Sequence, residues 1–335
     1  MKIKKKICAG IIGSGIGIKH LEAINELKYS KVKYLCEFNN KKINLLKKKY
    51  PHIEIIKEPK KIFLDADINL VSIASYDNFH YQQIMESLKY NKNIIVEKPM
   101  CLNVRQLKII KKNFLNKKIK IISNLVLREN NLFKKIKKSL KKREIYYIEA
   151  DYIWGRKFKL FEWRSKIKNY SITLGAAIHL IDLIYWMLKK KPIFVTAYGN
   201  NIATKHSSFK SKSFAVFLFE YQDGLIAKVS ANCSSVYEHF HELKIFEKNS
   251  TYVNSFKGNF VFKKNKKNKI SLDALKAIYP DKRSRKNIIQ NFIYDIQKNK
   301  KNSIMSLQEQ IDVMSICFAC DESLKENKKI RIKYV

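Results

Sequence analysis

The chain has 335 residues, which is enough for two domains and a large buried core. Hydrophobic residues make up 46% and charged residues 29%, a balance that is typical of globular proteins and excludes disordered or fibrous chains. Glycine (9) and proline (5) are scarce, which excludes collagen-like and linker-rich architectures. The formal net charge of +39 raises the question of an anionic partner.

The residues up to about 124 alternate short apolar runs with amphipathic stretches. Strands are expected at 7–12, 32–36, 53–56, 70–74, 94–96 and 119–122. Helices are expected at 20–27, 41–50, 80–90 and 104–114. Continuous apolar strands that alternate with helices predict an α/β fold with a doubly wound parallel Rossmann sheet, covered on both faces.

The regular alternation of strand and helix patterns ends after about Asn124. Strands are expected at 146–154, 194–199, 214–221, 225–234 and 243–246, with Asp223-Gly224 as a hairpin turn. Helices are expected at 132–140, 176–188, 287–298 and 307–323, and the lysine-rich stretch 263–269 is expected to be an exposed loop. This pattern predicts an α+β domain with a mostly antiparallel open sheet, so the domains are expected at 1–124 and 125–335.

Lysine carries nearly all of the positive charge. Only 8 of the 68 basic residues are arginine, and the lysines are spread from Lys2 to Lys333. Arginine is the residue that binds phosphates and base edges bidentately. We therefore expect a solvated lysine surface and no specific nucleic-acid partner. The alternative is an electrostatic role, whose mildest form is a general attraction of anionic substrates.

The six cysteines have no disulfide-framework spacing, which favours a reducing cytoplasm. Cys317 and Cys320 form a C-x-x-C pattern inside an expected helix, so core packing is favoured over redox or metal chemistry. The most apolar later stretch, 172–188, is at the short limit for a membrane span and carries His179 and Asp182. No membrane segment is therefore expected.

A glycine cluster after the first expected strand predicts a phosphate site. Four of the nine glycines lie between positions 10 and 17, just before a helix. Gly13-Ser14-Gly15 supplies a tight turn and room for a pyrophosphate, and the helix directs its N–H groups at that anion. The full fingerprint would have a small residue at Ile18, so the match is incomplete.

Glu37 strengthens this prediction. It follows the second expected strand, 22 residues after Gly15, where a carboxylate binds the adenosine ribose. A carboxylate there would repel the 2′-phosphate of NADP, so NAD is expected, although Asn39, Asn40 and Lys41 lie close by. A purely structural turn is the alternative.

Short motifs elsewhere in the chain match a known family. They are Ile73-Ala74-Ser75, Asn78 with His80, Glu97-Lys98-Pro99, Asn124 with Arg128, Asp151-Tyr152, Trp163-Arg164, His179 with Asp182, and 319–324. Together they resemble the glucose–fructose oxidoreductase/inositol 2-dehydrogenase (Gfo/Idh/MocA) family over nearly the whole chain. The resemblance implies a cytoplasmic dehydrogenase of CH–OH groups in a sugar, cyclitol or nucleotide-linked sugar, assembled as a homodimer or homotetramer.

The chemistry of such an enzyme assigns roles to Lys98, His179 and Asp182. A hydroxyl proton must leave as hydride leaves the carbon. Lys98 follows the fifth expected strand, at the sheet edge where ligands gather, and burial near a cationic nicotinamide would lower its pKa. His179 and Asp182 share one helix face. We expect His179 to exchange the proton and Asp182 to orient it or bind substrate.

The remaining expected site residues follow from position and resemblance. The cofactor set is Gly13, Gly15, Ile16, Glu37, Ser75, Asn78, His80, Glu97, Lys98 and Arg164. The substrate set is Lys98, Tyr152, Arg164, His179 and Asp182. His239 and His241 would share a strand face, but without an acid or cysteine at ligand spacing no metal is expected.

One departure from the family affects the mechanism. Many members carry an aspartate four residues before the histidine and a glycine two before it, where this chain has Gly175 and Ala177. Either Lys98 and His179 suffice, or another acid such as Asp151 assists, or the enzyme is weak. A catalytically quiet NAD-binding sensor or scaffold is therefore the alternative function, and a nucleic-acid-binding protein is a third.

Overall fold

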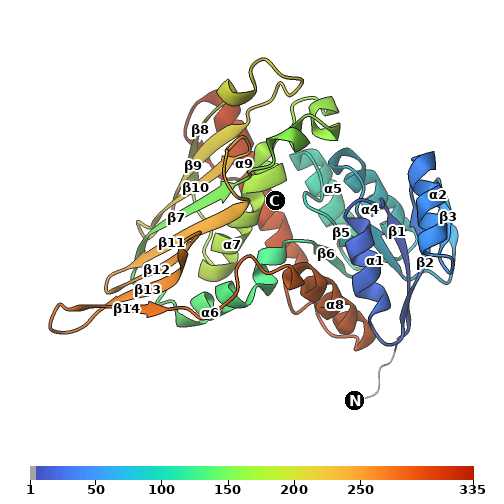
Figure 1. Ribbon diagram of the computed structural model, residues 1–335, viewed down its shortest axis with the longest axis horizontal. Coiled ribbons are helices and arrows are strands. Elements are labelled where there is room, and N and C mark those ends of the chain that lie inside the picture. The colour runs from blue at the N-terminus through green and yellow to red at the C-terminus, as the bar shows by residue number, and fades with distance from the viewer. Residues whose placement is uncertain (1–4) are drawn as a thin grey trace. The chain divides into compact units, whose positions relative to one another are not determined.

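The computed structural model describes residues 5–335, which divide into two compact units (Figure 1). The first unit runs to Glu129 and also includes Lys282–Ile311 and Val335. The second unit consists of Asn130–Asp281 and Asp312–Tyr334. The sequence predicted a boundary at 124, and the first unit of the structure continues to Glu129 before the chain enters the second unit. The sequence also placed 282–311 in the second domain, whereas this segment belongs to the first unit.

The first unit contains a six-stranded parallel sheet with the order β3-β2-β1-β4-β5-β6. The strands are β1 (Ile7–Ile12), β2 (Ser30–Cys36), β3 (Glu54–Ile56), β4 (Leu70–Ile73), β5 (Asn93–Val96) and β6 (Ile121–Ser123). Every residue of β1, β4 and β5 is buried, as a sheet covered on both faces requires. The predicted doubly wound fold is confirmed.

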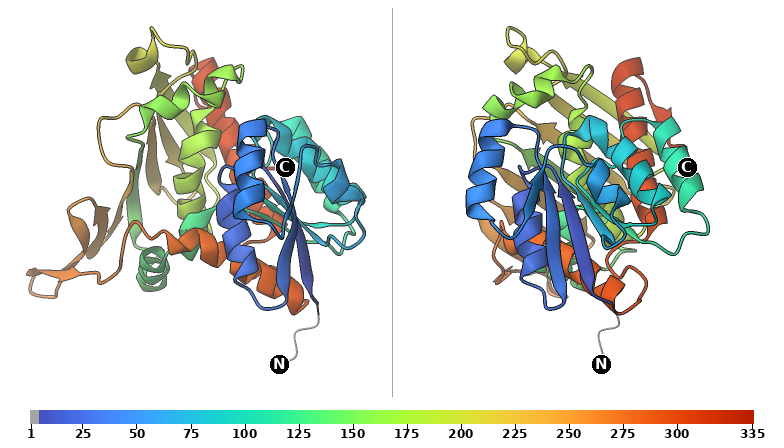
Figure 2. Two further views of the ribbon diagram at one scale, coloured as in Figure 1. Left: turned by 45° about the vertical axis from the view of Figure 1, so that its right-hand side comes forward. Right: turned by 90° about the vertical axis from the view of Figure 1, so that its right-hand side faces the viewer.

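Helices lie on either side of this sheet (Figure 2). They are α1 (Gly17–Asn25), α2 (Asn40–Lys49), α3 (Lys60–Leu64), α4 (His80–Lys89), α5 (Val104–Phe114) and α8 (Arg283–Gln297). Helix α1 packs against α8, and α4 packs against α5. The side chains of Asn39 and Asn103 accept hydrogen bonds from the backbone of α2 and α5, which explains where these helices begin.

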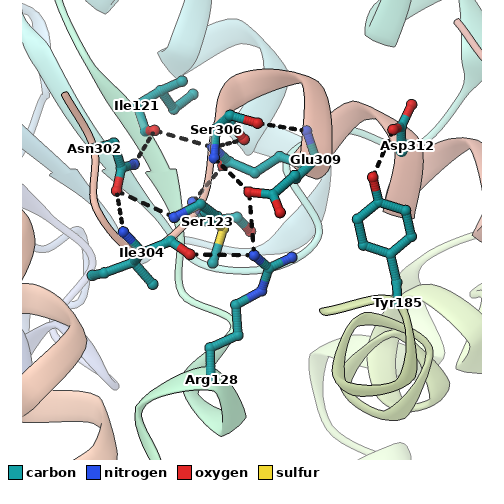
Figure 3. A network of polar contacts seen from close by, with 11 residues as sticks. Ile121, Ser123, Arg128, Tyr185, Asn302, Ile304, Ser306, Glu309 and Asp312 are labelled. Carbon is teal, nitrogen blue, oxygen red and sulfur yellow. Dashed lines mark hydrogen bonds and ion pairs between the residues drawn. The ribbon is translucent and has the colours of Figure 1, made fainter. Parts of the chain in front are cut away.

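A buried arginine explains why 282–311 returns to the first unit. Arg128, in the short helix η2 (Val126–Glu129), is 1% exposed. Its guanidinium donates to the carbonyl oxygen of Ile304 at 3.3 Å and lies 3.5 Å from the Glu309 carboxylate (Figure 3). The Gln310 side chain also accepts from the backbone N–H of Ser123. These contacts join residues that are 176 and 187 positions apart in the sequence, so local sequence patterns do not predict them.

The second unit contains a nine-stranded sheet with the order β14-β13-β12-β11-β7-β10-β9-β8-β15. The strands are β7 (Ile145–Ile153), β8 (Phe194–Asn200), β9 (Phe214–Glu220), β10 (Ile226–Asn232), β11 (Phe240–Glu247), β12 (Ser250–Ser255), β13 (Gly258–Lys264), β14 (Ile270–Ala274) and β15 (Ile330–Arg331). Strands β7 and β10 are parallel, and all other neighbouring pairs of strands in this sheet are antiparallel. The predicted mostly antiparallel sheet is confirmed.

One face of this sheet is covered by helix and the other carries charges. Ile148, Ala150 and Tyr152 of β7 are buried, and α7 (Ile178–Leu188) packs against this strand. The alternate residues Glu149 and Asp151 point to the opposite face. There the Lys228 ammonium contacts the Glu149 carboxylate at 2.9 Å and that of Asp151 at 2.6 Å.

The long helix α9 (Leu307–Glu326) spans the sequence boundary between the units. Within the second unit, the Asp312 carboxylate accepts a hydrogen bond from the Tyr185 hydroxyl at 2.8 Å (Figure 3). Cys317 and Cys320 are fully buried on this helix, and burial raises the pKa of both thiols. The expected core packing of the C-x-x-C pattern is confirmed. Among residues 5–335, no helix is both long and apolar enough to cross a membrane.

Candidate active site

The glycine turn at the carboxyl end of β1 has the shape of a phosphate cradle. Gly13 has φ +97°, and a Cβ there would overlap the backbone of Ala74. No atom lies within 4 Å of a Cβ placed on Gly15, so that side of the turn is open. No side chain caps the N-terminus of α1, which follows at Gly17. Its first N–H groups can therefore bind an anion.

Glu37 lies at the end of β2 and turns towards this loop. It is 4% exposed, and its carboxylate accepts a hydrogen bond from the Ser14 hydroxyl. Its other oxygen accepts from the backbone N–H of Asn39 at 2.9 Å. The Ser14 hydroxyl thus links the Glu37 carboxylate to the glycine turn. A dinucleotide site needs these two features close together, because one binds the ribose and the other the pyrophosphate.

The other expected cofactor residues of this unit also follow strands or the glycine turn. Ile16 is the N-cap of α1, and Asn78 is exposed in η1 (Asp77–Phe79). The Ser75 hydroxyl donates to the side chain of Gln83. His80 is fully buried, with Nδ1 2.7 Å from the carbonyl oxygen of Pro99 and Nε2 3.1 Å from that of Ser75. His80 therefore links the backbone that follows β4 to the backbone that follows β5.

Glu97 is held at the carboxyl end of β5, immediately before Lys98. Its Oε1 atom lies 3.1 Å from Nε2 of His20 and accepts from Nδ2 of Asn124 at 2.6 Å. Arg285 Nε is 3.9 Å away. Burial alone would raise the pKa of Glu97, but the hydrogen bonds with His20 and Asn124 and the positive charge of Arg285 hold it well below its usual range. Glu97 is thus an ionised, fixed carboxylate.

The second unit gathers imidazole and phenol rings on the covered face of its sheet. Tyr152 stacks on His179, with ring centroids 6.0 Å apart, and packs edge-to-face on His239 and His241. Tyr279 forms a short hydrogen bond of 2.5 Å with Nδ1 of His241. Residues expected to bind substrate are therefore neighbours of two histidines that are far away in sequence.

His239, just before β11, and His241, on β11, are neutral hydrogen-bonding groups. Burial, with a smaller contribution from His239, lowers the pKa of His241 to about 3. Burial and the nearby Arg156 lower the pKa of His239. The carbonyl of Ile153 accepts a hydrogen bond from Nδ1 of His239 at 3.3 Å, so Nε2 of that ring carries a lone pair. Neutral imidazoles of this kind suit substrate hydroxyl groups.

Two further expected residues belong to this unit. Asp182 is fully buried on α7, one turn after the half-buried His179. Arg164 is held by internal contacts: its guanidinium lies over the Trp163 ring at 4.2 Å, and its Nε donates to the Tyr170 hydroxyl at 3.2 Å. These contacts fix the orientation of Arg164.

The structure explains the glycine at position 175 and excludes one alternative acid. A Cβ on Gly175 would overlap the hydroxyl of Tyr170, so no larger side chain fits there without movement. Asp151 lies on the face of β7 opposite Tyr152, paired with Lys228 and Ser230. Because Tyr152 stacks on His179, Asp151 points away from His179. Asp151 is therefore not placed to take over the role of an aspartate at position 175 beside His179.

Four residues of these groups were missed by the sequence analysis: His20, Tyr170, His241 as a neighbour of His179, and Tyr279. The position of His20 just after the glycine cluster was a usable signal, because a helix that follows such a turn faces the same sheet edge. Tyr170 and Tyr279 lie in irregular segments whose spacing carries no such signal. Among the described residues, no group of His, Cys, Asp and Glu is placed to hold a metal ion.

The parallel sheet, its open glycine turn and the joined Glu37 carboxylate define a dinucleotide-binding protein with a second α+β unit. A sequence model described as "Oxidoreductase family, NAD-binding Rossmann fold" (Gfo/Idh/MocA) matches residues 7–124. A model of the carboxyl-terminal domain of the same family matches residues 135–253. The chain therefore belongs to the Gfo/Idh/MocA family of oxidoreductases.

Curated relatives are distant. The uncharacterized oxidoreductase YrbE of Bacillus subtilis is 22% identical over 250 residues, 72% of each chain. The scyllo-inositol 2-dehydrogenase (NADP(+)) IolW of the same organism is 25% identical over 185 residues, 52% of this chain and 50% of that protein. The curated relatives are matched over between 41% and 72% of their own lengths.

Solved structures show the same fold. The myo-inositol 2-dehydrogenase of Lactobacillus plantarum superposes with a TM-score of 0.85 at 18% identity, covering 98% of this chain and 100% of that one. The scyllo-inositol dehydrogenase of Lactobacillus casei, solved with NAD(H) and scyllo-inositol, superposes with a TM-score of 0.82 at 19% identity, covering 98% and 99%. At these identities the likeness concerns the fold.

Proposed function

We propose that the protein is an NAD-dependent dehydrogenase of a CH–OH group in a cyclitol, a sugar or a nucleotide-linked sugar. The observation that carries the proposal is the joining of Glu37 to the open glycine turn through Ser14. NAD, when bound, supplies the acceptor for the hydride. Glu37 would accept hydrogen bonds from both hydroxyls of an adenosine ribose and would repel a 2′-phosphate, which favours NAD over NADP.

The protein's own groups would handle the proton. Lys98 follows β5 beside the fixed Glu97 carboxylate, where we propose that its amine meets the reacting hydroxyl. His179 would exchange that proton, and the buried Asp182 one turn later would orient His179 or bind substrate. Arg164, fixed by Trp163 and Tyr170, would bind the cofactor or substrate.

The substrate class is supported by the second unit. Tyr152, His239 and His241 offer hydrogen-bonding edges without a charge at neutral pH, which suits a ring with several hydroxyl groups. Inositol dehydrogenases among the relatives support the same class.

We further propose that the protein is cytoplasmic and forms a homodimer or homotetramer through the open face of the nine-stranded sheet.

The proposal is tested by binding and turnover together. Calorimetry should find NADH binding with at least several-fold preference over NADPH. A panel of inositols, hexoses and nucleotide-linked sugars should contain a compound that reduces NAD in the presence of the enzyme. Absence of NADH binding would contradict the cofactor assignment, whatever the panel shows.

A catalytically quiet NAD-binding sensor is the second candidate. Tyr170 fills the space beside Gly175, where many family members carry an aspartate. Under this candidate NADH binds as above, but no compound of the panel is oxidised. The two outcomes therefore separate an enzyme from a sensor.

A further inference from the structure

A fully buried histidine links the phosphate-binding helix to the backbone that carries Lys98. His20 lies in the first turn of α1 and is 0% exposed. Nδ1 of its ring is 2.7 Å from the Ser72 hydroxyl, at β4. Nε2 is 3.1 Å from Oε1 of Glu97, at the end of β5. One side chain thus joins three elements at the ligand-binding edge of the sheet.

The chemistry of these partners fixes which hydrogen atoms are present. Nε2 of His20 lies 3.1 Å from Oε1 of Glu97 and 3.3 Å from Nδ2 of Asn124. Because the ionised carboxylate only accepts hydrogen bonds, the shorter contact requires a hydrogen on Nε2. The Ser72 hydroxyl can either donate to Nδ1 or accept from it. Asn124 follows β6 and is 1% exposed. Its Nδ2 atom donates a hydrogen bond to the same Glu97 oxygen at 2.6 Å. Its Oδ1 atom is buried without a hydrogen-bond partner.

We infer that His20 is a positioning residue of the reaction centre, which acts through Glu97 on Lys98 and on Asn124. Glu97 receives hydrogen bonds from α1 and β6, and Arg285 of α8 balances its charge. Its carboxylate therefore fixes the backbone next to Lys98 and the rotamer of Asn124. Because Nδ2 of Asn124 is bound to Glu97, its Oδ1 atom remains to accept a hydrogen bond from the cofactor. This inference rests on the proposed function.

The hydrogen bond itself can be tested without cofactor or substrate. The chain has seven histidines, so selective ¹⁵N labelling of histidine rings gives a resolvable NMR spectrum. We expect a strongly downfield Nε2–H proton for His20, absent in His20→Gln and moved upfield in Glu97→Gln, whose neutral amide is a weaker acceptor. A His20 ring without hydrogen at Nε2, or one unaffected by Glu97→Gln, would overturn the inference.

The positioning role is tested with NADH as the probe. His20→Leu removes the hydrogen-bond donor and fills most of the same space with an apolar side chain, whereas His20→Gln can still donate to Glu97. We expect His20→Leu to weaken NADH binding about tenfold and to change the emission of bound NADH. His20→Gln should remain within about threefold of the parent, because it keeps a hydrogen bond of similar strength.

A matched control separates positioning from general destabilisation. Ile24 lies one turn further along the same face of α1 and is 0% exposed, so Ile24→Val disturbs the same packing without touching Glu97. Its NADH affinity should equal that of the parent. Should His20→Leu fail to fold, Glu97→Gln should show the same tenfold loss. Parent-like affinity and emission in both variants would overturn the positioning role, whereas no NADH binding by the parent would contradict the proposed function instead.

Discussion

The hydroxyl of Tyr170 lies against the Cα of Gly175, in the space that any side chain at position 175 would enter. Tyr170 is 8% exposed, and its hydroxyl also accepts a hydrogen bond from Arg164. The glycine, the tyrosine and the arginine therefore form one local arrangement. An aspartate at position 175 would therefore require Tyr170 to move.

Gly175→Asp alone should lower stability without raising turnover. The new carboxylate would overlap Tyr170, and overpacking of this kind costs about 1–3 kcal/mol. Adding Tyr170→Ala should recover part of the loss, because it makes room for the carboxylate. Calorimetric melting of both single variants and the double variant measures this coupling. If Gly175→Asp melts at the same temperature as the parent, Tyr170 moves aside at no cost in stability, which would contradict this prediction.

Glu37→Gln should narrow the preference for NADH over NADPH. The amide keeps the shape of the carboxylate but loses its negative charge, so it no longer repels a 2′-phosphate. Isothermal calorimetry with both cofactors measures the ratio of the dissociation constants. Glu58→Gln, an exposed change of the same net charge, should leave the ratio unchanged. A parent that prefers NADPH would refute the Glu37 assignment.

The sequence predicted the first unit well for a physical reason. Continuous apolar strands such as β1 and β5 are distinctive, and the Asn103 cap and apolar face of α5 define that helix to the residue. Strands β12, β13 and β14 were missed, because serine, asparagine and lysine residues interrupt their apolar residues, and the loop expected at 263–269 overlaps the end of β13. Strand β15 has two residues, too few for a pattern.

The candidate site was predictable only where residues follow strands. Glu37 and Lys98 each stand just after a strand, which places them at a known sheet edge. Tyr279 reaches His241 across 38 residues, and Arg128 reaches Ile304 across 176. Such contacts depend on tertiary packing, and local spacing carries no information about them.

Asp321 should make stability depend on pH between about 4 and 6. Burial raises its pKa from 3.8 to about 6, although the hydrogen bond from the Ser171 hydroxyl opposes this shift. The folded protein therefore holds this proton more tightly than the unfolded chain. The resulting stabilisation, at most about 3 kcal/mol, is complete below pH 4 and is lost as the pH rises through 6.

Asp321→Asn isolates this effect, since the amide cannot titrate and still accepts from Ser171. The difference in melting temperature between parent and variant should favour the parent most at pH 4 and least at pH 7. Glu322→Gln, an exposed neighbour, should show no such trend. A constant difference from pH 4 to 7 would contradict the raised pKa.

Binding to DNA should be weak and electrostatic. A lysine-rich surface releases counterions without reading bases, so affinity should fall steeply with salt. Fluorescence anisotropy with two unrelated duplexes, at low and at physiological salt, measures this directly. Sequence-selective binding that persists at physiological salt would favour a nucleic-acid function.

Lys98 and His179 should behave as one catalytic unit. If both carry the same proton, His179→Asn should lower turnover, and the Lys98→Met/His179→Asn double variant should lose less than the product of the two single losses. Steady-state kinetics of the three variants on one substrate measures the coupling. Strict multiplicativity would mean that the two residues act independently.

The most direct test is the turnover of Lys98→Met with NAD and a substrate found in the panel. Methionine keeps the length of the side chain and removes the proton carrier, so kcat should fall by roughly 10²–10⁴ while NADH affinity changes little. Lys92→Met is the control, because the buried Lys92 lies at the other end of β5 and donates to the carbonyls of Asp65 and Ile68. Its kcat should stay near that of the parent. A Lys98→Met enzyme within a few-fold of the parent would contradict the placement of the active site.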